Sequence, residues 1–204
     1  MKIVVLKFGG TSVGTIKKIK KVTEIVAEYL KKNFKVIVVS SAMSGVTNGL
    51  IKKSKQISKD FPDEEYDVLV SSGEQVACSL IAGSLIQKGF KARSWLAWQI
   101  PILTKGPHKN SRIDNINTLK VLKYLREGGI PIITGFQGVN INEKVTTIGR
   151  GGSDASAIML AKVFKAQRCV IYTDVEGVYT TDPNKLKNAK KIKIISYEEM
   201  LEMA

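Results

Sequence analysis

The chain has 204 residues, 44% of them hydrophobic, and a formal net charge of +14 at pH 7. This composition favours a soluble globular protein with a sizeable core. The sequence has no apolar run near the roughly 20 residues that cross a bilayer and no signal peptide, so we expect a cytoplasmic location. The excess charge is almost all lysine spread over helix faces, with only five arginines and few aromatics, so a solvated surface is favoured over a nucleic-acid partner. Cys78 and Cys169 have no metal-site or redox spacing and are interpreted as core residues.

The first turn in the chain is a candidate phosphate site. Residues 3–6 form an apolar run that predicts a strand, and apolar side chains recur at helical spacing from residue 16 to residue 30. Between them, Gly9 and Gly10 allow the backbone to approach an anion, the first amides of a helix are free donors, and Lys7 adds a cation. An ordinary strand-to-helix turn in any α/β protein can also carry Gly-Gly, so both interpretations stay open.

A second strand is predicted at residues 36–39, and it leads into a polar turn at residues 40–47. Residues 64–88 are mostly helical in pattern, and we expect residues 71–74 to interrupt the helix so that Glu74 opens a new one. A buried glutamate would be costly without a cation, which makes Glu74 a functional candidate. The alternative is a solvated first-turn carboxylate favoured by the helix dipole.

The middle of the chain is less informative. Residues 91–104 are expected to be extended, with a break at residues 97–99, and residues 105–117 are expected to form a loop. That loop contains the only histidine, His108, which has no visible carboxylate or serine partner and therefore carries little weight as a catalyst. A helix at 118–127 and a strand at 130–134 follow, and the strand leads to a glycine turn at 135–138.

A second glycine turn, Gly-Arg-Gly-Gly-Ser-Asp at residues 149–154, follows a short strand at 145–148 and precedes a helix at 155–164. Ser153 or Asp154 is a possible N-cap, whereas Arg150 beside three glycines suits an oxyanion clamp. The last strand, residues 168–172, ends before Thr173 and Asp174. This alternation of strand, turn and helix predicts a mostly parallel sheet with helices on both faces and ligands at the carboxyl ends of the strands.

The common nucleotide signatures G-x-x-x-x-G-K-[ST] and G-x-G-x-x-G are absent, but six other motifs occur in order. They are Lys-Phe-Gly-Gly-Thr-Ser-Val from residue 7, Ser-Ala-Met-Ser-Gly-Val-Thr-Asn from 41, Ser-Gly-Glu from 72, Gly-Phe-Gln-Gly from 135, Gly-Arg-Gly-Gly-Ser-Asp from 149 and Thr-Asp-Val-Glu-Gly-Val-Tyr-Thr-Thr-Asp-Pro from 173. In this order they resemble the kinase domain of aspartokinases. The resemblance implies the amino-acid-kinase (carbamate-kinase-like) fold, a three-layer α/β/α sandwich with a mostly parallel sheet. It also implies MgATP-dependent phosphorylation of the L-aspartate side-chain carboxylate to 4-phospho-L-aspartate, the first step of lysine, threonine, methionine and diaminopimelate biosynthesis.

The resemblance also implies a role for each matching position. Lys7 would neutralise the transferring phosphoryl group, and Asp154 would orient this catalytic lysine. Arg150 would pair with the α-carboxylate of aspartate and Glu74 with its ammonium group. No metal ligand from the protein is implied, since Mg²⁺ would arrive with ATP. The other implied residues are Ser41, Thr47, Phe136 and Ser153 around the substrate, and Gly9, Gly10, Gly151, Gly152, Thr173, Asp174, Tyr179 and Asn184, with Lys7, around ATP.

Two departures from the family pattern qualify this expectation. Asn184 stands where an arginine is common, so a cation near the nucleotide is lost or is replaced by Lys185. Ser196 and Glu199 predict a capping box for a helix that stops after about two turns, so residues 1–204 are expected to be a kinase domain incomplete at its C-terminus. A further ATP-binding lysine and the regulatory ACT domains would lie beyond, and this chain would be weakly active or inactive.

Alternative functions remain open at this stage. The chain is also compatible with another amino-acid kinase, of the glutamate or acetylglutamate type, although the Ser-Gly-Glu and Gly-Arg-Gly-Gly-Ser-Asp motifs favour aspartate. A non-catalytic assembly module is the alternative from a different class. The expected partners are L-aspartate and ATP, with no nucleic acid or membrane, and the full-length protein is expected to form a homo-oligomer.

Overall fold

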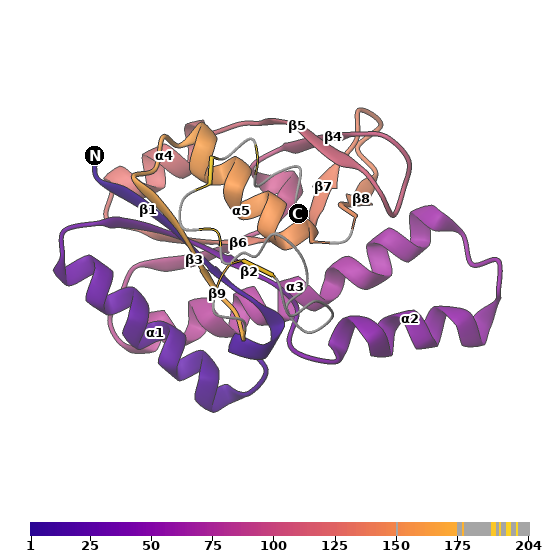
Figure 1. The fold of residues 1–204 in the computed structure, drawn as a ribbon, viewed down its shortest axis with the longest axis horizontal. Helices are drawn as coiled ribbons and strands as arrows, with labels where there is room; N and C mark the ends of the chain where they lie inside the picture. Colours follow the sequence, from indigo (N-terminus) through magenta and orange to yellow (C-terminus); the bar gives the residue numbers. More distant parts are fainter. Residues whose placement is uncertain are drawn as a thin grey trace.

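The fold is organised around a five-stranded parallel sheet with strand order β3-β6-β2-β1-β9 (Figure 1). The computed structural model describes residues 1–149, 151–174, 177, 189, 190, 192, 195, 196 and 199. The sheet confirms the parallel arrangement that the β-branched runs predicted. Its strands are β1 (Ile3–Phe8), β2 (Lys35–Ser40), β3 (Ala92–Trp95), β6 (Ile130–Thr134) and β9 (Arg168–Tyr172).

Helices cover both faces of this sheet, which confirms the three-layer α/β/α sandwich. Successive side chains of a strand point to opposite faces. In β1, Val4 and Leu6 therefore pack into one apolar cluster with α1 and α3, whereas Ile3 and Val5 pack into a second cluster with α4 and α5. The two clusters make β1 buried along its whole length. The covering helices are α1 (Ile16–Lys31), α3 (Asp63–Gln87), α4 (Leu119–Arg126) and α5 (Gly152–Val163).

A second, four-stranded sheet with the order β5-β4-β7-β8 adjoins this sandwich. The sequence did not predict it, and the expectation of a loop over residues 105–117 was wrong where β5 forms. Most of β5 is exposed, so it lacks the apolar alternation that marks a strand in sequence, and its pairing with β4 defines it instead. The strands are β4 (Ile102–Lys105), β5 (Arg112–Ile116), β7 (Gln137–Val139) and β8 (Val145–Thr147), and the 3-10 helix η2 (Ala97–Gln99) precedes β4.

The helix α3 runs unbroken through residues 71–74, so the predicted interruption there was wrong. The hydroxyl groups of Ser71 and Ser72 donate to the carbonyl oxygens three residues earlier, which satisfies these polar side chains inside a helix. Gly73 packs where a Cβ would lie 2.8 Å from Ala42 Cβ, and α2 (Val46–Ile57) lies alongside, giving the projecting hairpin of Figure 1. By length and composition α3 would suit a membrane span, but half of its most apolar window is buried in the protein.

Candidate active site

A cleft of about 330 Å³ opens at the carboxyl ends of β1 and β2, where parallel strands expose the turns that follow them. Sequence-predicted residues from five separate segments meet there. The polar turn after β2 also contributes residues to which the sequence analysis assigned no role in the site, although they lie in a quoted motif directly after a buried strand. The predicted residues lining the cleft are Lys7, Gly10, Ser41, Thr47, Glu74, Phe136, Gly151, Gly152, Ser153 and Asp154, and the additional ones are Ala42, Met43, Ser44, Gly45 and Asn48.

Lys7 and Asp154 form an ion pair in this cleft, with Lys7 Nζ 2.6 Å from Asp154 Oδ1. The lysine side chain, on β1, is 8% exposed, and the carboxylate of Asp154 offsets part of the cost of burying its charge. Asp154 Oδ1 has no aligned hydrogen-bond donor among the described residues, so the contact is an ion pair. The interpretation of Ser153 or Asp154 as an N-cap was wrong, because Gly151 is the N-cap and both residues lie inside the first turn of α5.

Glu74 is buried in the middle of α3, with 3% of its surface exposed, which overturns the alternative of a solvated first-turn carboxylate. Its Oε1 accepts a hydrogen bond of 3.0 Å from the backbone N–H of Ala42. Its Oε2 has no hydrogen-bond partner among the described residues. Burial raises the pKa of this carboxyl group to about 7. A cation entering the cleft would find half of this carboxylate unsatisfied.

The backbone around the cleft is packed tightly. A Cβ at Gly10 would lie 2.9 Å from the carbonyl oxygen of Ala42, so only glycine lets the turn after β1 approach the turn after β2. Phe136 has a φ of 66°, an uncommon conformation for a residue with a side chain, and its N–H donates to Ser156 Oγ at 3.1 Å. This strained turn brings Phe136 to the cleft beside the start of α5.

Thr173 and Asp174 line a neighbouring pocket of about 340 Å³ rather than the cleft that holds Lys7. Gly9 lies near both regions, because its N–H donates to Tyr172 O at 3.0 Å and a Cβ there would be 3.5 Å from Lys7 Nζ. The turn at Gly9 enters a 3-10 helix, η1 (Gly10–Ser12), so the amides here belong to η1 and α1 begins later, at Ile16. The other predicted site residues, Arg150, Tyr179 and Asn184, lie outside the described residues.

His108 does have a carboxylate partner, contrary to the sequence analysis. Its Nδ1 lies 2.7 Å from Oδ2 of Asp67, which is fully buried on α3. Asp67 also accepts hydrogen bonds from the N–H of Lys109 and the hydroxyl of Thr147. The two residues are 41 positions apart, so no local pattern could have paired them. The pair joins α3 to the loop before β5, and neither residue lines the cleft with Lys7.

The capping box predicted at the end of the chain is present. Ser196 N donates to Glu199 Oε2 at 2.8 Å, and Glu199 N donates to Ser196 Oγ at 3.2 Å. Each side chain therefore satisfies the backbone N–H of the other residue.

Residues 2–204 match the model of the amino acid kinase family. The chain belongs to the amino acid kinase family. Over its whole length this amino acid kinase is 52% identical to the aspartokinase of Geobacillus stearothermophilus and 50% identical to that of Rickettsia conorii. It covers 50% and 52% of those proteins, so it spans about half the length of the curated relatives it matches.

Solved structures support the same relationship. This kinase domain resembles aspartate kinase from Synechocystis with a TM-score of 0.78 and 39% identity, covering 98% of this chain and 33% of that one. It resembles E. coli aspartokinase III in complex with aspartate and ADP with a TM-score of 0.80 and 28% identity, covering 94% of this chain and 53% of that one. These matches confirm the resemblance to aspartokinases on which the sequence analysis rested.

Proposed function

We propose that this chain is the kinase domain of an aspartate kinase, which transfers the γ-phosphoryl group of ATP to the side-chain carboxylate of L-aspartate. A carboxylate oxygen of aspartate forms a bond to the γ-phosphorus, the bond from that phosphorus to the β–γ bridging oxygen breaks, and ADP leaves with the electron pair. The products are 4-phospho-L-aspartate and ADP. Because the substrate carboxylate is itself the nucleophile, no protein nucleophile and no proton removal are needed.

The observation that carries this proposal is that one cleft contains both a cation, Lys7, and a buried carboxylate, Glu74. Lys7 offers an ammonium group held in place by Asp154, as a transferring phosphoryl group requires. Glu74 offers a buried carboxylate oxygen with no partner among the described residues, as the α-ammonium group of an amino acid requires. Aspartate would therefore bind with its ammonium group at Glu74 and its side chain directed toward Lys7.

The remaining assignments follow from the sequence motifs and from the linings of the two pockets. Ser41, Thr47, Phe136 and Ser153 shape the aspartate site in this proposal, and Arg150 pairs with the α-carboxylate. Gly9, Gly10, Gly151 and Gly152 face the phosphates. Thr173 and Asp174, in the adjacent pocket, contact the nucleoside together with Tyr179 and Asn184. Support for ATP comes from the relative whose structure contains aspartate and ADP.

Magnesium enters this proposal as part of the substrate. Among the described residues, no group of three or more His, Cys, Asp or Glu side chains is arranged to hold a metal ion. In this proposal the phosphate oxygens of ATP carry Mg²⁺ into the cleft, which is a common mode of binding for this ion. Lys7 and the backbone N–H donors would then stabilise the negative charge of the transferring phosphoryl group that Mg²⁺ does not neutralise.

The unsatisfied oxygen of Glu74 also discriminates between candidate substrates. N-acetylglutamate has an amide in place of the ammonium group, so it would leave the buried carboxylate without a cation. L-glutamate keeps the ammonium group but is one methylene longer, which would move its side-chain carboxylate relative to Lys7. Aspartate is therefore favoured over both.

We further propose that the protein acts in the cytoplasm, at the entry to lysine, threonine, methionine and diaminopimelate biosynthesis. In this proposal, residues 1–204 are one incomplete kinase domain, and the whole protein carries regulatory ACT domains and forms a homo-oligomer.

The proposal is tested by trapping the acyl phosphate. Hydroxylamine converts 4-phospho-L-aspartate to a hydroxamate, which is measured beside ADP release with aspartate, glutamate and N-acetylglutamate as acceptors. The assay should use both the 204-residue chain and the gene product from which it comes. Hydroxamate formed only with aspartate supports the proposal. Equal product with glutamate, or calorimetric binding of ATP and aspartate without product in the longer protein, would reject it in favour of another kinase or a non-catalytic module.

A further inference from the structure

A third pocket, of about 480 Å³, lies where strand β3 meets helix α4. Strand β3 is at the edge of the parallel sheet, and β6 and β2 separate it from β1, which carries Lys7. None of the residues that line this third pocket takes part in the proposed aspartate kinase reaction. We call it the β3–α4 pocket, and its lining includes Arg93, Trp95, Lys120, Lys123, Tyr124 and Glu127.

Trp95, which lines the β3–α4 pocket, has a buried donor that lacks an acceptor. Trp95 is 5% exposed, and its indole Nε1 has no hydrogen-bond partner among the described residues. Indole nitrogen is a donor only, so no rearrangement of its own proton can satisfy it. Because buried donors in folded proteins are nearly always paired, this one points to an acceptor supplied by a ligand.

The charges around this donor favour an anion. Lys91 forms an ion pair of 3.0 Å with Glu127, the only carboxylate that lines the pocket among the described residues. Lys120 Nζ donates to the carbonyl oxygen of Gln99, which leaves its charge uncompensated. No carboxylate of the described residues forms a salt bridge with Arg93 or Lys123. The pocket and its rim therefore hold four cations against one carboxylate.

The aromatic side chains define the shape of the site. The guanidinium group of Arg93 lies over the Trp95 ring, 4.2 Å from its centroid, and this stacking pre-positions a planar, multiply donating cation. The Tyr124 ring meets the Trp95 ring edge to face, with centroids 5.6 Å apart. Arginine and lysine together with an N–H donor match the oxygens of a phosphate group. The pocket is larger than a phosphate ion requires, and the aromatic rings offer a surface for an organic group.

We propose that the β3–α4 pocket binds a phosphate monoester dianion. Arg93 and Lys123 contact the phosphate oxygens, the indole N–H of Trp95 donates to one of them, and the organic part packs against Tyr124. The site is separate from the cleft of Lys7 and does not depend on the proposed kinase reaction.

The test is a titration of the 204-residue chain with phenyl phosphate, followed by ¹H–¹⁵N NMR of the indole N–H groups. The chain has two tryptophans, and Trp98 lines a different pocket, so its signal is an internal control. The Trp95 signal should move saturably while that of Trp98 does not. Arg93→Gln and Lys123→Gln should each raise the Kd about tenfold through loss of one charge-assisted hydrogen bond.

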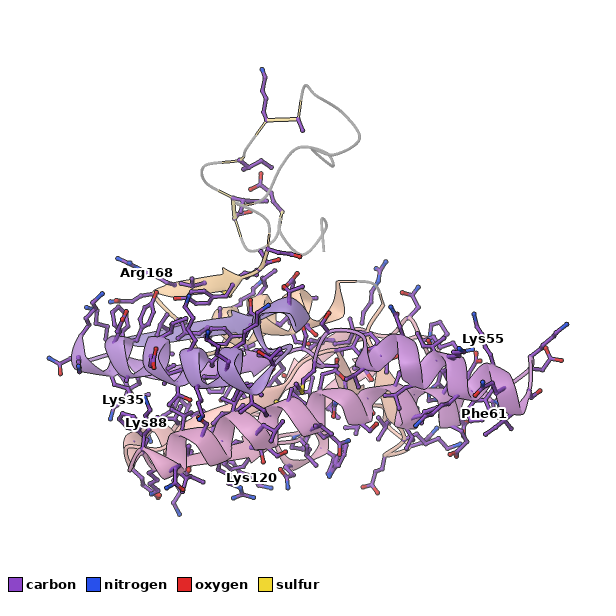
Figure 2. The ribbon with its side chains drawn as sticks, turned by 90° about the horizontal axis from the view of Figure 1, so that it is seen from below. Lys35, Lys55, Phe61, Lys88, Lys120 and Arg168 are labelled. Atoms are coloured by element: carbon purple, nitrogen blue, oxygen red, sulfur yellow. The ribbon has the colours of Figure 1, made fainter. Side chains whose placement is uncertain are left out.

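Three controls establish whether the Trp95 signal reports a phosphate monoester bound in the β3–α4 pocket. Lys55→Gln changes an exposed lysine on the α2–α3 hairpin, well away from Lys120 in Figure 2, and should leave the Kd unchanged. Lys7→Met, which alters the cleft, should also leave the Trp95 titration unchanged. Inorganic phosphate should bind more weakly than phenyl phosphate, and equal affinity would assign the site to the free ion and overturn the monoester proposal. If the chemical shift of the Trp95 indole N–H does not change during the titration, or changes with protein concentration instead of ligand concentration, the proposal of a binding site in this pocket is wrong.

Discussion

Glu74→Gln tests whether a buried carboxyl group with a raised pKa controls both the stability and the ligand binding of this kinase domain. Glutamine has nearly the same shape, and its carbonyl oxygen can still accept the hydrogen bond from Ala42 N. The substitution therefore removes the ionisation of residue 74 while keeping its packing. Glu65→Gln, on the same helix and exposed, is the matched control.

The sign of the effect on stability follows from the direction of the shift. Burial raises the pKa of Glu74 from 4.5 to about 7, so between these values the folded state holds a proton that the unfolded state has released. The free energy of unfolding must then fall as pH rises through this window. With 1.36 kcal/mol per pKa unit, the full loss is about 3 kcal/mol. This loss of unfolding free energy is complete above about pH 7 and does not occur below pH 4.5.

The assay is urea unfolding at several pH values between 5 and 8 for the parent, Glu74→Gln and Glu65→Gln. The stability of Glu74→Gln relative to the parent should increase by about 3 kcal/mol across this range, since the variant has no carboxyl group to ionise at this position. Glu65→Gln should follow the parent at every pH. Parallel curves for the parent and Glu74→Gln would refute the reasoning.

The same substitution tests the proposed substrate site by calorimetry. If the aspartate ammonium group pairs with ionised Glu74, affinity should fall about tenfold per pH unit below 7, because binding must first displace a proton. Binding to Glu74→Gln should be weaker by about 2 kcal/mol at pH 8 and should lack this dependence. If the parent shows the stability profile but its aspartate affinity does not vary with pH, Glu74 is buried as described but does not bind the substrate.

Three further substitutions have defined outcomes. Lys7→Met should lower kcat about a hundredfold or more in the gene product that contains this chain while changing aspartate affinity little, since the lysine stabilises the transferring phosphoryl group. A near-normal kcat would contradict its assignment. Gly73→Ala should destabilise the fold by about 1–3 kcal/mol, because the new Cβ would lie 2.8 Å from Ala42 Cβ. Gly83→Ala on the same helix meets nothing within 4 Å and should stabilise the fold by about 1 kcal/mol. Denaturant midpoints measure both effects, and equal effects of the two substitutions would reject the packing argument. Asp67→Ala should lower the free energy of unfolding, measured by thermal denaturation, by about 3 kcal/mol, because His108, Lys109 and Thr147 lose their acceptor. A loss no larger than that caused by Asp60→Ala, at an exposed position, would show that this buried network contributes little to stability.

The main elements of the sandwich were predictable because they have strong local patterns. The β-branched run at residues 36–39 predicted a buried parallel strand, and the apolar spacing from residue 16 predicted an amphipathic helix. Lys7 near the end of β1, the glycines that follow β1 and the glycines before Asp154 also marked the segments that line the cleft. The rule that parallel strands present their carboxyl ends at one edge was sufficient to expect these turns to meet.

Tertiary contacts decided what local patterns could not. Glu74 followed two serines and a glycine that suggested a helix start, but packing against the turn after β2 holds α3 continuous and buries the carboxylate. His108 looked unpartnered because Asp67 lies 41 residues away. Strand β5 is mostly exposed, so only its pairing with β4 reveals it. The sequence by itself determined which chemical groups this kinase carries and predicted the strand ends at which most of them lie, because those signals are local. The tertiary structure alone decided which groups are buried, paired or left unsatisfied, because burial and pairing depend on residues distant in the chain.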